Sequence, residues 1–334
     1  MQTHDIVVIG ASAGGVEALK QITTQLDPNI KAAIFAVVHV SPRSSGLLAN
    51  VLDRNSAIPV AHPEDGERIE QGRVYVAPPD HHLLIEGNHI RVVNGPKHNR
   101  HRPSIDVLFR SAARHFAERA IGVVLTGFLQ DGSSGLLAIK NAGGIAVIQN
   151  PDDAEVASMP RSALQQVEPD YCVPVAEIGE LLNRLTSLEA ETMAAAKSGN
   201  GKDRKLQKKT VPTTFTCPDC QGTIWEVEEN GEIRYECRVG HSYSPDGMSE
   251  AQDEHVERSV WMALRVLEES SALDERLAEV AASRSRHNAQ RFYEQKAHAR
   301  KHHAAVLREF LLGSKRRHSE AEGEAGKEEI KRVS

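Results

Sequence analysis

The stretch IVVIGASAGGVEAL, residues 6–19, joins an apolar run to a helix-like segment through a glycine-rich turn. Four consecutive β-branched residues predict a strand that is buried on both faces. Gly10-x-Ser12-x-Gly14 is the pattern of a nucleophile elbow, in which glycines allow a tight strand-to-helix turn that exposes a serine hydroxyl. The helix that follows would bring unpaired N–H groups close to a developing oxyanion. The stretch therefore makes Ser12 a candidate nucleophile.

Apolar runs and helix-like stretches alternate through the rest of residues 1–188. Predicted strands follow at 33–38, 58–61, 74–77, 121–126 and 144–149 and near Tyr171, with a hairpin at 83–93. Predicted helices cover 15–26, 104–118, 133–142 and 153–165. Continuous apolar strands that alternate with helices are typical of a parallel sheet covered on both faces. We therefore predict a doubly wound, mainly parallel α/β domain.

Two further residues follow apolar strands as Ser12 does. His39 comes directly after 33–38, and Asp131 lies in the turn TGFLQDG after the strand at 121–126. Open α/β sheets bind their ligands outside the carboxyl ends of their parallel strands. A hydroxyl nucleophile needs a base, and an imidazole base needs a carboxylate that fixes its tautomer. Ser12, His39 and Asp131 are therefore the candidate nucleophile, base and orienting carboxylate.

Other interpretations compete for the glycine-rich turn. A dinucleotide-binding fingerprint needs glycine where this chain has Ser12, and an acidic residue about 20 positions further on, where it has Val38-His39. A Walker loop needs a Gly-Lys-Ser/Thr ending, which the turn lacks. A purely structural turn would leave His39 as a packing histidine and Asp131 as a turn aspartate. The position of all three residues directly after predicted strands favours catalysis over a structural turn. The order Ser…His…Asp along the chain differs from the Ser…Asp…His order of α/β-hydrolases, so that family is excluded.

Six blocks of the sequence, in order, closely resemble the catalytic domain of CheB, the chemotaxis-type protein-glutamate methylesterase and glutamine deamidase. They are GASAGGVEAL, VVHVSP, YVAPPDHHLLI, HRPSIDVLFRSAA, VLTGFLQDGSSGL and NPDDAEVASMPRSAL. The resemblance covers about residues 4–188. It implies hydrolysis of glutamate methyl esters on the cytoplasmic helical bundles of chemoreceptors, with release of methanol, and in some members deamidation of glutamine at the same sites.

The resemblance also implies roles for single residues. Carried over by motif, the family's nucleophile falls on Ser12, its base on His39 and its aspartate on Asp131. A backbone N–H in the Gly127–Phe128 turn, assigned to Phe128, is the expected oxyanion donor. Family members usually read Thr-Gly-Met-Gly-x-Asp-Gly in this turn, whereas this chain has Phe128 and Leu129 where Met and Gly are typical. A leucine in the glycine position is expected to shift the loop.

A second departure from the family concerns its control. Two-domain members begin with a phosphoacceptor receiver domain, but only five residues precede the first predicted strand here. We therefore expect no control by phosphorylation in cis. A catalytically inactive adaptor, which would use the same fold to bind a receptor or kinase, is the alternative to an esterase.

A cluster of cysteines predicts a metal site. Cys217 and Cys220 form a CxxC pair, and Cys237 and His241 follow after sixteen residues that alternate like a hairpin around Glu-Asn-Gly. A CxxC knuckle gives two thiolates to one tetrahedral metal, and the second pair closes the site. We predict a zinc-ribbon-like module over 213–246 with structural Zn²⁺ and no open position for catalysis. A redox CxxC would leave Cys237 and His241 unexplained.

The remaining segments are set apart by composition. Residues 189–212 are basic and aperiodic and predict a flexible linker. Residues 247–313 are rich in Ala, Glu, Arg and Leu and predict a helical hairpin or arm with a break near 283–287. Residues 314–334 are expected to be disordered. The arm is expected to pack on itself or on a second copy, and signalling-array proteins are the other candidate partners.

Composition excludes several classes of protein. The net charge of −6, the pI of about 6.3 and 4% aromatic residues argue against a nucleic-acid-binding protein. No apolar run approaches the ~20 residues that span a bilayer, and the N-terminus lacks a signal-peptide pattern. Three of the four cysteines fall in one 21-residue window, which favours a metal site in a reducing compartment over a disulfide scaffold. We therefore expect a cytoplasmic protein without membrane insertion.

Overall fold

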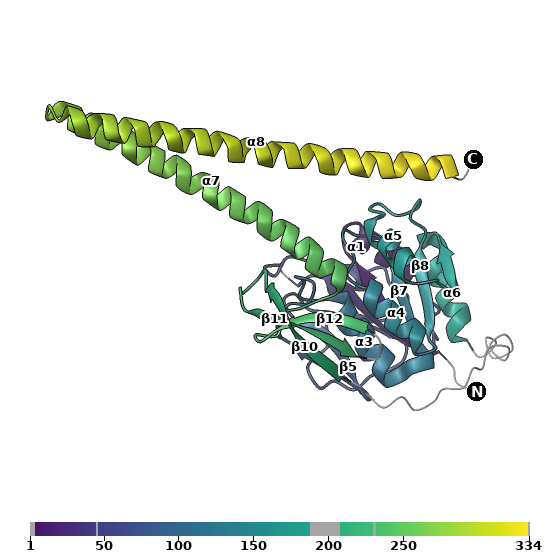
Figure 1. The fold of residues 1–334 in the computed structure, drawn as a ribbon. Helices are drawn as coiled ribbons and strands as arrows, with labels where there is room; N and C mark the ends of the chain where they lie inside the picture. The colour runs from purple at the N-terminus through teal and green to yellow at the C-terminus, as the bar shows by residue number, and fades with distance from the viewer. Residues whose placement is uncertain (1–3, 45, 188–207, 230–231, 333–334) are drawn as a thin grey trace. The chain divides into compact units, whose positions relative to one another are not determined.

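The computed structural model describes residues 4–44, 46–187, 208–229 and 232–332 of the 334-residue chain, with side chains as far as Leu312. The chain divides into two compact units, Met1–Ser249 and Glu250–Ser334. The first unit holds the predicted α/β domain and the Cys3His module, and the second is helical (Figure 1).

Seven strands in the described residues form a single parallel sheet in the first unit. In spatial order they are β3 (Val60–Ala61), β4 (Arg73–Val76), β2 (Ala33–Val38), β1 (Ile6–Ala11), β7 (Ala120–Val124), β8 (Ile145–Gln149) and β9 (Tyr171–Val173). The chain winds outward from β1 through β2 to β3 and β4, then crosses to β7 and winds outward in the other direction. The switch in winding direction therefore lies at β1, where open α/β sheets carry their ligand sites.

Helices cover both faces of this sheet (Figure 1). One face packs against α1 (Gly15–Gln25), α2 (Leu48–Asp53) and α6 (Val175–Thr186). The other packs against α3 (Ile105–Phe116), α4 (Ser133–Asn141), α5 (Ser158–Gln166) and the hairpin β5 (His82–Glu86) and β6 (His89–Val93). Every residue of β1, β2 and β7 is buried, as continuous apolar strands require. The predicted mainly parallel α/β fold is confirmed.

Four helical features differ from the sequence-based prediction. Helices α2 and α6 were not predicted, and a 3₁₀ turn (Ala117–Arg119) follows α3. The helix predicted from residue 153 begins at Ser158, because Pro160 is tolerated only in the first turn of a helix. None of these differences moves the strand ends that carry Ser12, His39 and Asp131.

A four-stranded antiparallel sheet follows in the same unit. Its strands are β10 (Lys208–Thr216), β11 (Thr223–Glu229), β12 (Glu232–Cys237) and β13 (Ser242–Tyr243). The predicted linker 189–212 was wrong in its last five residues, which belong to β10, and the rest of it, 189–207, lies outside the described residues. The register explains this, since Lys209 pairs with Glu228 across the two strands and β-branched Thr210 and Val211 favour a pleated conformation.

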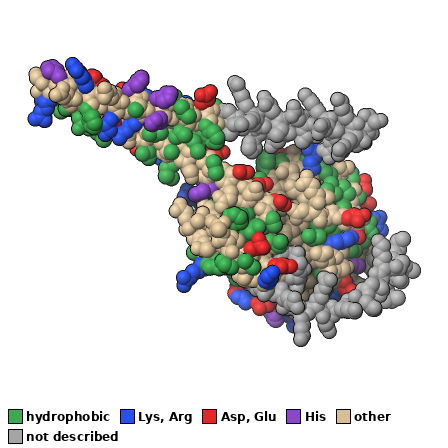
Figure 2. Space-filling model, in the orientation of Figure 1, with side chains coloured by type: hydrophobic (Ala, Val, Ile, Leu, Met, Phe, Trp, Pro, Cys, Tyr) green, Lys and Arg blue, Asp and Glu red, His purple; other side chains and the backbone are tan. Residues whose placement is uncertain are grey.

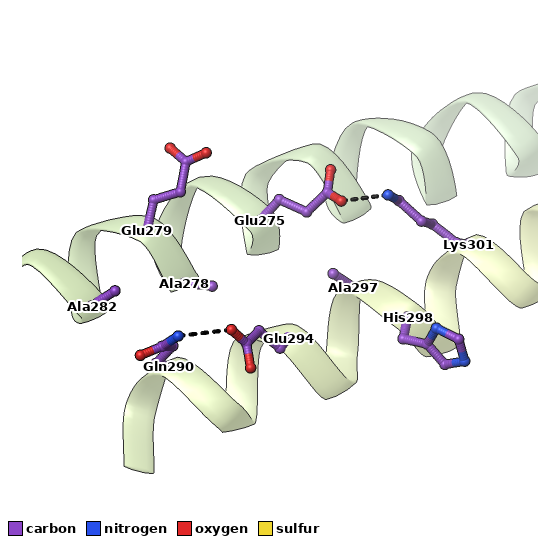
Figure 3. Close-up of a pocket in the computed structure, with 9 residues that line it drawn as sticks. All are labelled: Glu275, Ala278, Glu279, Ala282, Gln290, Glu294, Ala297, His298 and Lys301. Atoms are coloured by element: carbon purple, nitrogen blue, oxygen red, sulfur yellow. Dashed lines mark hydrogen bonds and ion pairs between the residues drawn. The ribbon is translucent and has the colours of Figure 1, made fainter. Parts of the chain in front are cut away.

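The second unit is a pair of long helices. Helix α7 (Pro245–Ser283) enters it from the first unit, and α8 (His287–Arg332) follows after the expected break. Helix α8 continues through the segment predicted to be disordered from residue 314, whose Glu, Lys, Arg and Ala residues are good helix formers. A groove of about 630 Å³ between the helices is lined by alanines and by charged side chains, including the ion-paired Glu275 and Lys301 (Figure 3).

The helical arm has a sparse core. Leu264, Ala304 and Leu311 are its buried cluster, whereas Met262 and Leu273 are more than half exposed. Figure 2 shows hydrophobic side chains gathered along one face of this arm. Self-association or contact with signalling-array proteins stays a prediction. No helix within the described ranges is both long enough and apolar enough to cross a membrane.

Candidate active site

Strand register brings the three candidate residues to one edge of the sheet. Ala11 and Val38 are paired in β1 and β2, and Ser12 and His39 are the next residues along each strand. The His39 amide donates to the Ala11 carbonyl at 3.1 Å, which holds the two strand ends together. Asp131 lies in the loop after β7, on the other side of β1. The sheet therefore places all three residues after neighbouring strand ends at one edge, and the side chains of His39 and Asp131 are in direct contact.

The turn that carries Ser12 depends on its second glycine. Gly14 has φ of 75° and sits before the first residue of α1. A side chain there would be strained in this left-handed conformation, and its Cβ would lie 2.7 Å from Oε2 of Glu155. The Ser12 amide donates to the Thr126 carbonyl at 3.0 Å, so the elbow is bound directly to the end of β7. The candidate nucleophile is thus fixed by two neighbouring strands.

His39 and Asp131 form a buried pair. Nε2 of His39 lies 2.9 Å from Oδ2 of Asp131, and the two side chains are 8% and 1% exposed. Because the carboxylate accepts the Nε2 proton, the neutral ring carries its lone pair on Nδ1. This Nδ1 is buried and has no hydrogen-bond partner in the described part of the chain. Nδ1 is therefore the atom of His39 that is free to act as a base, and the candidate nucleophile Ser12 follows the paired end of the neighbouring strand.

Asp131 is held by donors on every side. Within the described residues, its carboxylate accepts hydrogen bonds from Nε2 of His39, Nδ2 of Asn99, Oγ of Ser104, and the amides of Ile105 and Asp106. Burial acts to raise the pKa of Asp131, but the hydrogen bond and charge of His39 and the Ile105 amide outweigh it and hold the pKa below its usual range. The carboxylate therefore stays ionised and its orientation is fixed.

Two polar residues beside Asp131 were not predicted from the sequence. Asn99 donates through Nδ2 to Oδ2 of Asp106 at 2.8 Å and to Oδ1 of Asp131 at 3.1 Å, which separates two buried carboxylates. Oδ1 of Asp106 also accepts the amides of Gly132 and Gly135 at the start of α4. Burial raises the pKa of Asp106 to about 6. Asp106 ends the HRPSID block, and Asn99 lies two residues before it. The many polar residues in front of a helix are the sequence signal that could have indicated both.

His101 packs directly on the base. Its ring stacks on His39 with centroids 3.7 Å apart and planes 4° apart. Burial, with the nearby His39, lowers the pKa of His101 to about 4, so its ring is neutral at pH 7. A neutral ring allows His39 to take up a proton during catalysis without a second positive charge against its face.

The turn after β7 adopts an unusual backbone. Leu129, at the position of the family glycine, has φ of 65°. The Gly127 amide is committed to the Val156 carbonyl at 3.0 Å, whereas no acceptor for the Phe128 amide is found among the residues described. The Phe128 side chain is 59% exposed. The amide of Phe128 is thus available as an oxyanion donor, and leucine is accommodated in a conformation that favours glycine.

Comparison with known proteins identifies the family of the α/β domain. The family model described as CheB methylesterase matches residues 7–182, which is more than half of the chain. The chain belongs to the CheB methylesterase family. The crystal structure of the Thermotoga maritima CheB methylesterase catalytic domain aligns with a TM-score of 0.53 and 34% identity, covering 55% of this chain and 99% of that one. The matched residues of this CheB-family chain include Ser12, His39 and Asp131.

Relatives of the CheB-family domain differ in length. A Leptospira interrogans protein, provisionally named as a protein-glutamate methylesterase/protein-glutamine glutaminase, is 43% identical over 183 residues, covering 54% of this chain and 95% of that protein. A Burkholderia lata protein named protein-glutamate methylesterase/protein-glutamine glutaminase 3 is 40% identical over 193 residues, 56% of this chain and 53% of that protein. The chain thus spans about half the length of its Burkholderia relative.

The Cys3His cluster lies beyond the residues that match the CheB family. Its ligand atoms all lie within 4.8 Å of one another. Sγ of Cys220 is 3.6 Å from Sγ of Cys237, and Nδ1 of His241 is 3.6 Å from Cys217 and 3.5 Å from Cys237. A tetrahedral Zn²⁺ would set these separations at about 3.8 Å between sulfurs and about 3.6 Å between nitrogen and sulfur. The donor set therefore fits a tetrahedral metal.

Proposed function

We propose that this chain hydrolyses glutamate methyl esters on the cytoplasmic domains of chemoreceptors, releasing methanol. The observation that carries the proposal is the buried His39–Asp131 pair, with Nδ1 of His39 unpartnered beside the elbow that presents Ser12. Membership of the CheB methylesterase family and relatives named for the same activity support it. The choice of methylated chemoreceptors as the substrate rests on the resemblance of the sequence to the CheB catalytic domain.

The geometry supports a two-step acyl transfer. Nδ1 of His39 takes the Ser12 proton while Oγ attacks the ester carbonyl, and Asp131 stabilises the imidazolium that forms. The tetrahedral oxyanion is met by the Phe128 amide, a donor of a kind worth roughly 3–4 kcal/mol. Methanol departs with the proton from His39. Water, deprotonated by the same nitrogen, then attacks the glutamyl-enzyme ester and releases glutamate and Ser12.

Deamidation of glutamine would follow the same path. The leaving group is then ammonia instead of methanol, and it again takes its proton from His39. The relatives named for both activities support this second reaction at a single site.

We propose that Cys217, Cys220, Cys237 and His241 hold structural Zn²⁺. The cysteines are thiols without disulfides, since the 3.6 Å between Cys220 and Cys237 far exceeds the ~2.05 Å of a disulfide bond. Four protein donors fill a tetrahedral shell, so the metal would serve folding and not the ester chemistry.

Methanol release from a methylated chemoreceptor cytoplasmic domain tests the proposed esterase. Wild type is expected to release methanol, and Ser12→Ala to lower kcat by at least ~10⁴-fold, because no other hydroxyl replaces the nucleophile. The exposed Ser44→Ala variant is the matched control and should retain wild-type turnover.

The same assay separates the esterase from a catalytically inactive adaptor. An adaptor would bind the methylated receptor domain with equal affinity in wild type and Ser12→Ala, and neither protein would release methanol. That outcome would overturn the proposed esterase.

A further inference from the structure

A loop of the α/β domain lies between the Cys3His module and the active site. We call residues 95–103, between β6 and α3, the bridging loop. The Asn99 amide donates to the Ser242 carbonyl at 2.9 Å, and His98 forms a parallel β-bridge with Ser242. Strand β13 of the module is therefore hydrogen-bonded to the loop whose other side reaches Asp131.

The side chain of Asn99 connects the two regions directly. Its Oδ1 accepts the Ser244 amide at 2.9 Å, while Nδ2 donates to Asp106 and Asp131. Asn99 is only 7% exposed, and it has φ of 45°, a conformation that asparagine tolerates better than most residues. Its amide group has both donors and its acceptor engaged, so it cannot shift on one side without losing a bond on the other.

The module contacts this loop through the turn at residues 237–242, which contains the candidate ligands Cys237 and His241. Ser242 directly follows the ligand His241, whose carbonyl accepts the Cys237 amide at 3.0 Å. Gly240, in the same turn, packs so closely on Pro96 that an added Cβ would lie 2.7 Å from Cγ of Pro96. The residues on either side of the ligand His241 thus contact the bridging loop.

We propose that Asn99 is a positioning residue through which the metal-bound Cys3His module holds Asp131 in its catalytic orientation. The inference rests on the proposed esterase activity and makes that activity depend on a metal that touches no substrate. Without metal, the four ligands lose their common centre and β13 loses its anchor. Asn99 then loses its bonds to Ser242 and Ser244, and Asp131 loses one fixed donor.

The dependence on metal is tested with the full chain loaded with Zn²⁺, stripped by a chelator, and reloaded, with metal content measured by elemental analysis. Stripping is expected to lower kcat for methanol release by about 10–100-fold, as loss of supporting hydrogen bonds around a reactive site does, with KM changed less than about threefold. Reloading should restore kcat. Equal kcat in the stripped and loaded chains would overturn the proposal.

Asn99→Ala then tests the route of the coupling. In the zinc-loaded chain this variant should lower kcat to the level of the stripped wild type, and stripping it should have little further effect, because both changes remove the same contact. Asn94→Ala is the matched control, since Asn94 is exposed and donates to Asp80, away from Asp131. A full additional loss of kcat on stripping Asn99→Ala would exclude Asn99 as the link.

A readout without turnover keeps this inference separate from the proposed function. The proton between Nε2 of His39 and Asp131 can be followed by NMR in histidine-labelled full chain. Its resonance should move on stripping the metal and on Asn99→Ala, but not on Asn94→Ala. If this resonance moves while zinc-loaded wild type releases no methanol, the esterase proposal fails and the coupling stands. An unmoved resonance overturns the coupling, and the wild-type measurement decides this even where Asn99→Ala does not fold.

Discussion

The α/β domain and the Cys3His module are ordered by different forces. The sheet of the α/β domain is buried between two clusters of apolar side chains, one on each face. In the described part of β10–β13 and its knuckles, the buried apolar side chains are few: Pro218, Ile224, Val227, Tyr243 and two of the candidate ligands, Cys217 and Cys237. We therefore expect this small sheet to need a metal to fold.

This difference between apolar burial and metal binding separates the catalytic role of the α/β domain from the proposed controlling role of the module. A sheet fixed by burial brings Asp131 to most of its donors without help from any ligand, and the module is expected to hold the remaining donor, Asn99. We expect the module to change state with its metal while the sheet stays folded. Asn99 lies where these regions meet, and a condition that acts on the module alone can therefore reach the active site.

The largest expected effect is loss of the module on removal of one ligand. Cys220→Ser should cost most of the metal-binding free energy, which is about 10 kcal/mol or more for structural zinc. Hydrogen exchange should show β10–β13 unprotected, with β1, β2 and β7 still protected. Cys172→Ser is the matched control, because Cys172 lies exposed on β9 outside the cluster. Protection of β10–β13 that survives Cys220→Ser would mean that apolar burial alone holds the module.

The next largest effect is expected in the α/β domain. Asp131→Asn should lower kcat by about 10⁴-fold, because an amide in this position favours the wrong tautomer of His39. Unfolding in urea should also show a loss of stability, since the pocket supplies only donors to this side chain. Asp170→Asn, at a carboxylate bonded to Lys140 on the surface, should retain kcat. Turnover within tenfold of wild type in Asp131→Asn would remove Asp131 from the mechanism.

The sequence predicted those parts of the site that follow buried strands. Ser12, His39 and Asp131 each come after an apolar run, and the carboxyl ends of neighbouring parallel strands must meet at one edge. Asn99 follows no such rule. It lies in a loop without periodicity, and its role depends on the tertiary contacts that bring Ser244 and Asp131 to either side of it.

The errors in the predicted fold have similar causes. Helix α6 was missed although its apolar residues follow helical spacing, whereas α2 is only six residues long and gives little pattern to detect. The start of β10 was interpreted as linker because its lysines are unpaired in the sequence alone. In the structure, Lys208 and Lys209 pair with Glu229 and Glu228 of β11, and this pairing depends on the strand register, which the sequence alone does not specify.

Lower pH should weaken the bridging loop in which the two regions meet. The pKa of His101 is lowered to about 4 from 6.5 by burial, and that of His98 to about 3 from 6.5 by burial. Between these values and pH 6.5 the unfolded chain takes up protons that the folded chain does not, so stability falls as pH falls through this window. From pH 7 to pH 5 we expect a loss of roughly 1–2 kcal/mol for each histidine.

Urea unfolding at pH 7 and pH 5 measures this loss. His101→Gln should reduce the difference between the two pH values, whatever it does to stability at pH 7. His89→Gln, at an exposed position on β6, should leave the difference unchanged. An undiminished pH dependence in His101→Gln would show that the bridging loop is not protected from protons by its burial.

The smallest expected effect compares two strained positions in the α/β domain. Leu129 and Ala117 have φ of 65° and 46°, where glycine is favoured, the first in the turn after β7 and the second at the end of α3. Replacing either residue by glycine should raise the free energy of unfolding by about 0.5–1 kcal/mol, because the left-handed backbone costs about 1–2 kcal/mol with a side chain. Only Leu129→Gly lies close enough to the Phe128 amide to alter kcat, and the change should stay within about threefold because that amide already lacks an acceptor among the described residues. If Leu129→Gly lowers stability instead, the leucine side chain packs well enough to outweigh its backbone strain, and the turn is a stable departure from the family pattern.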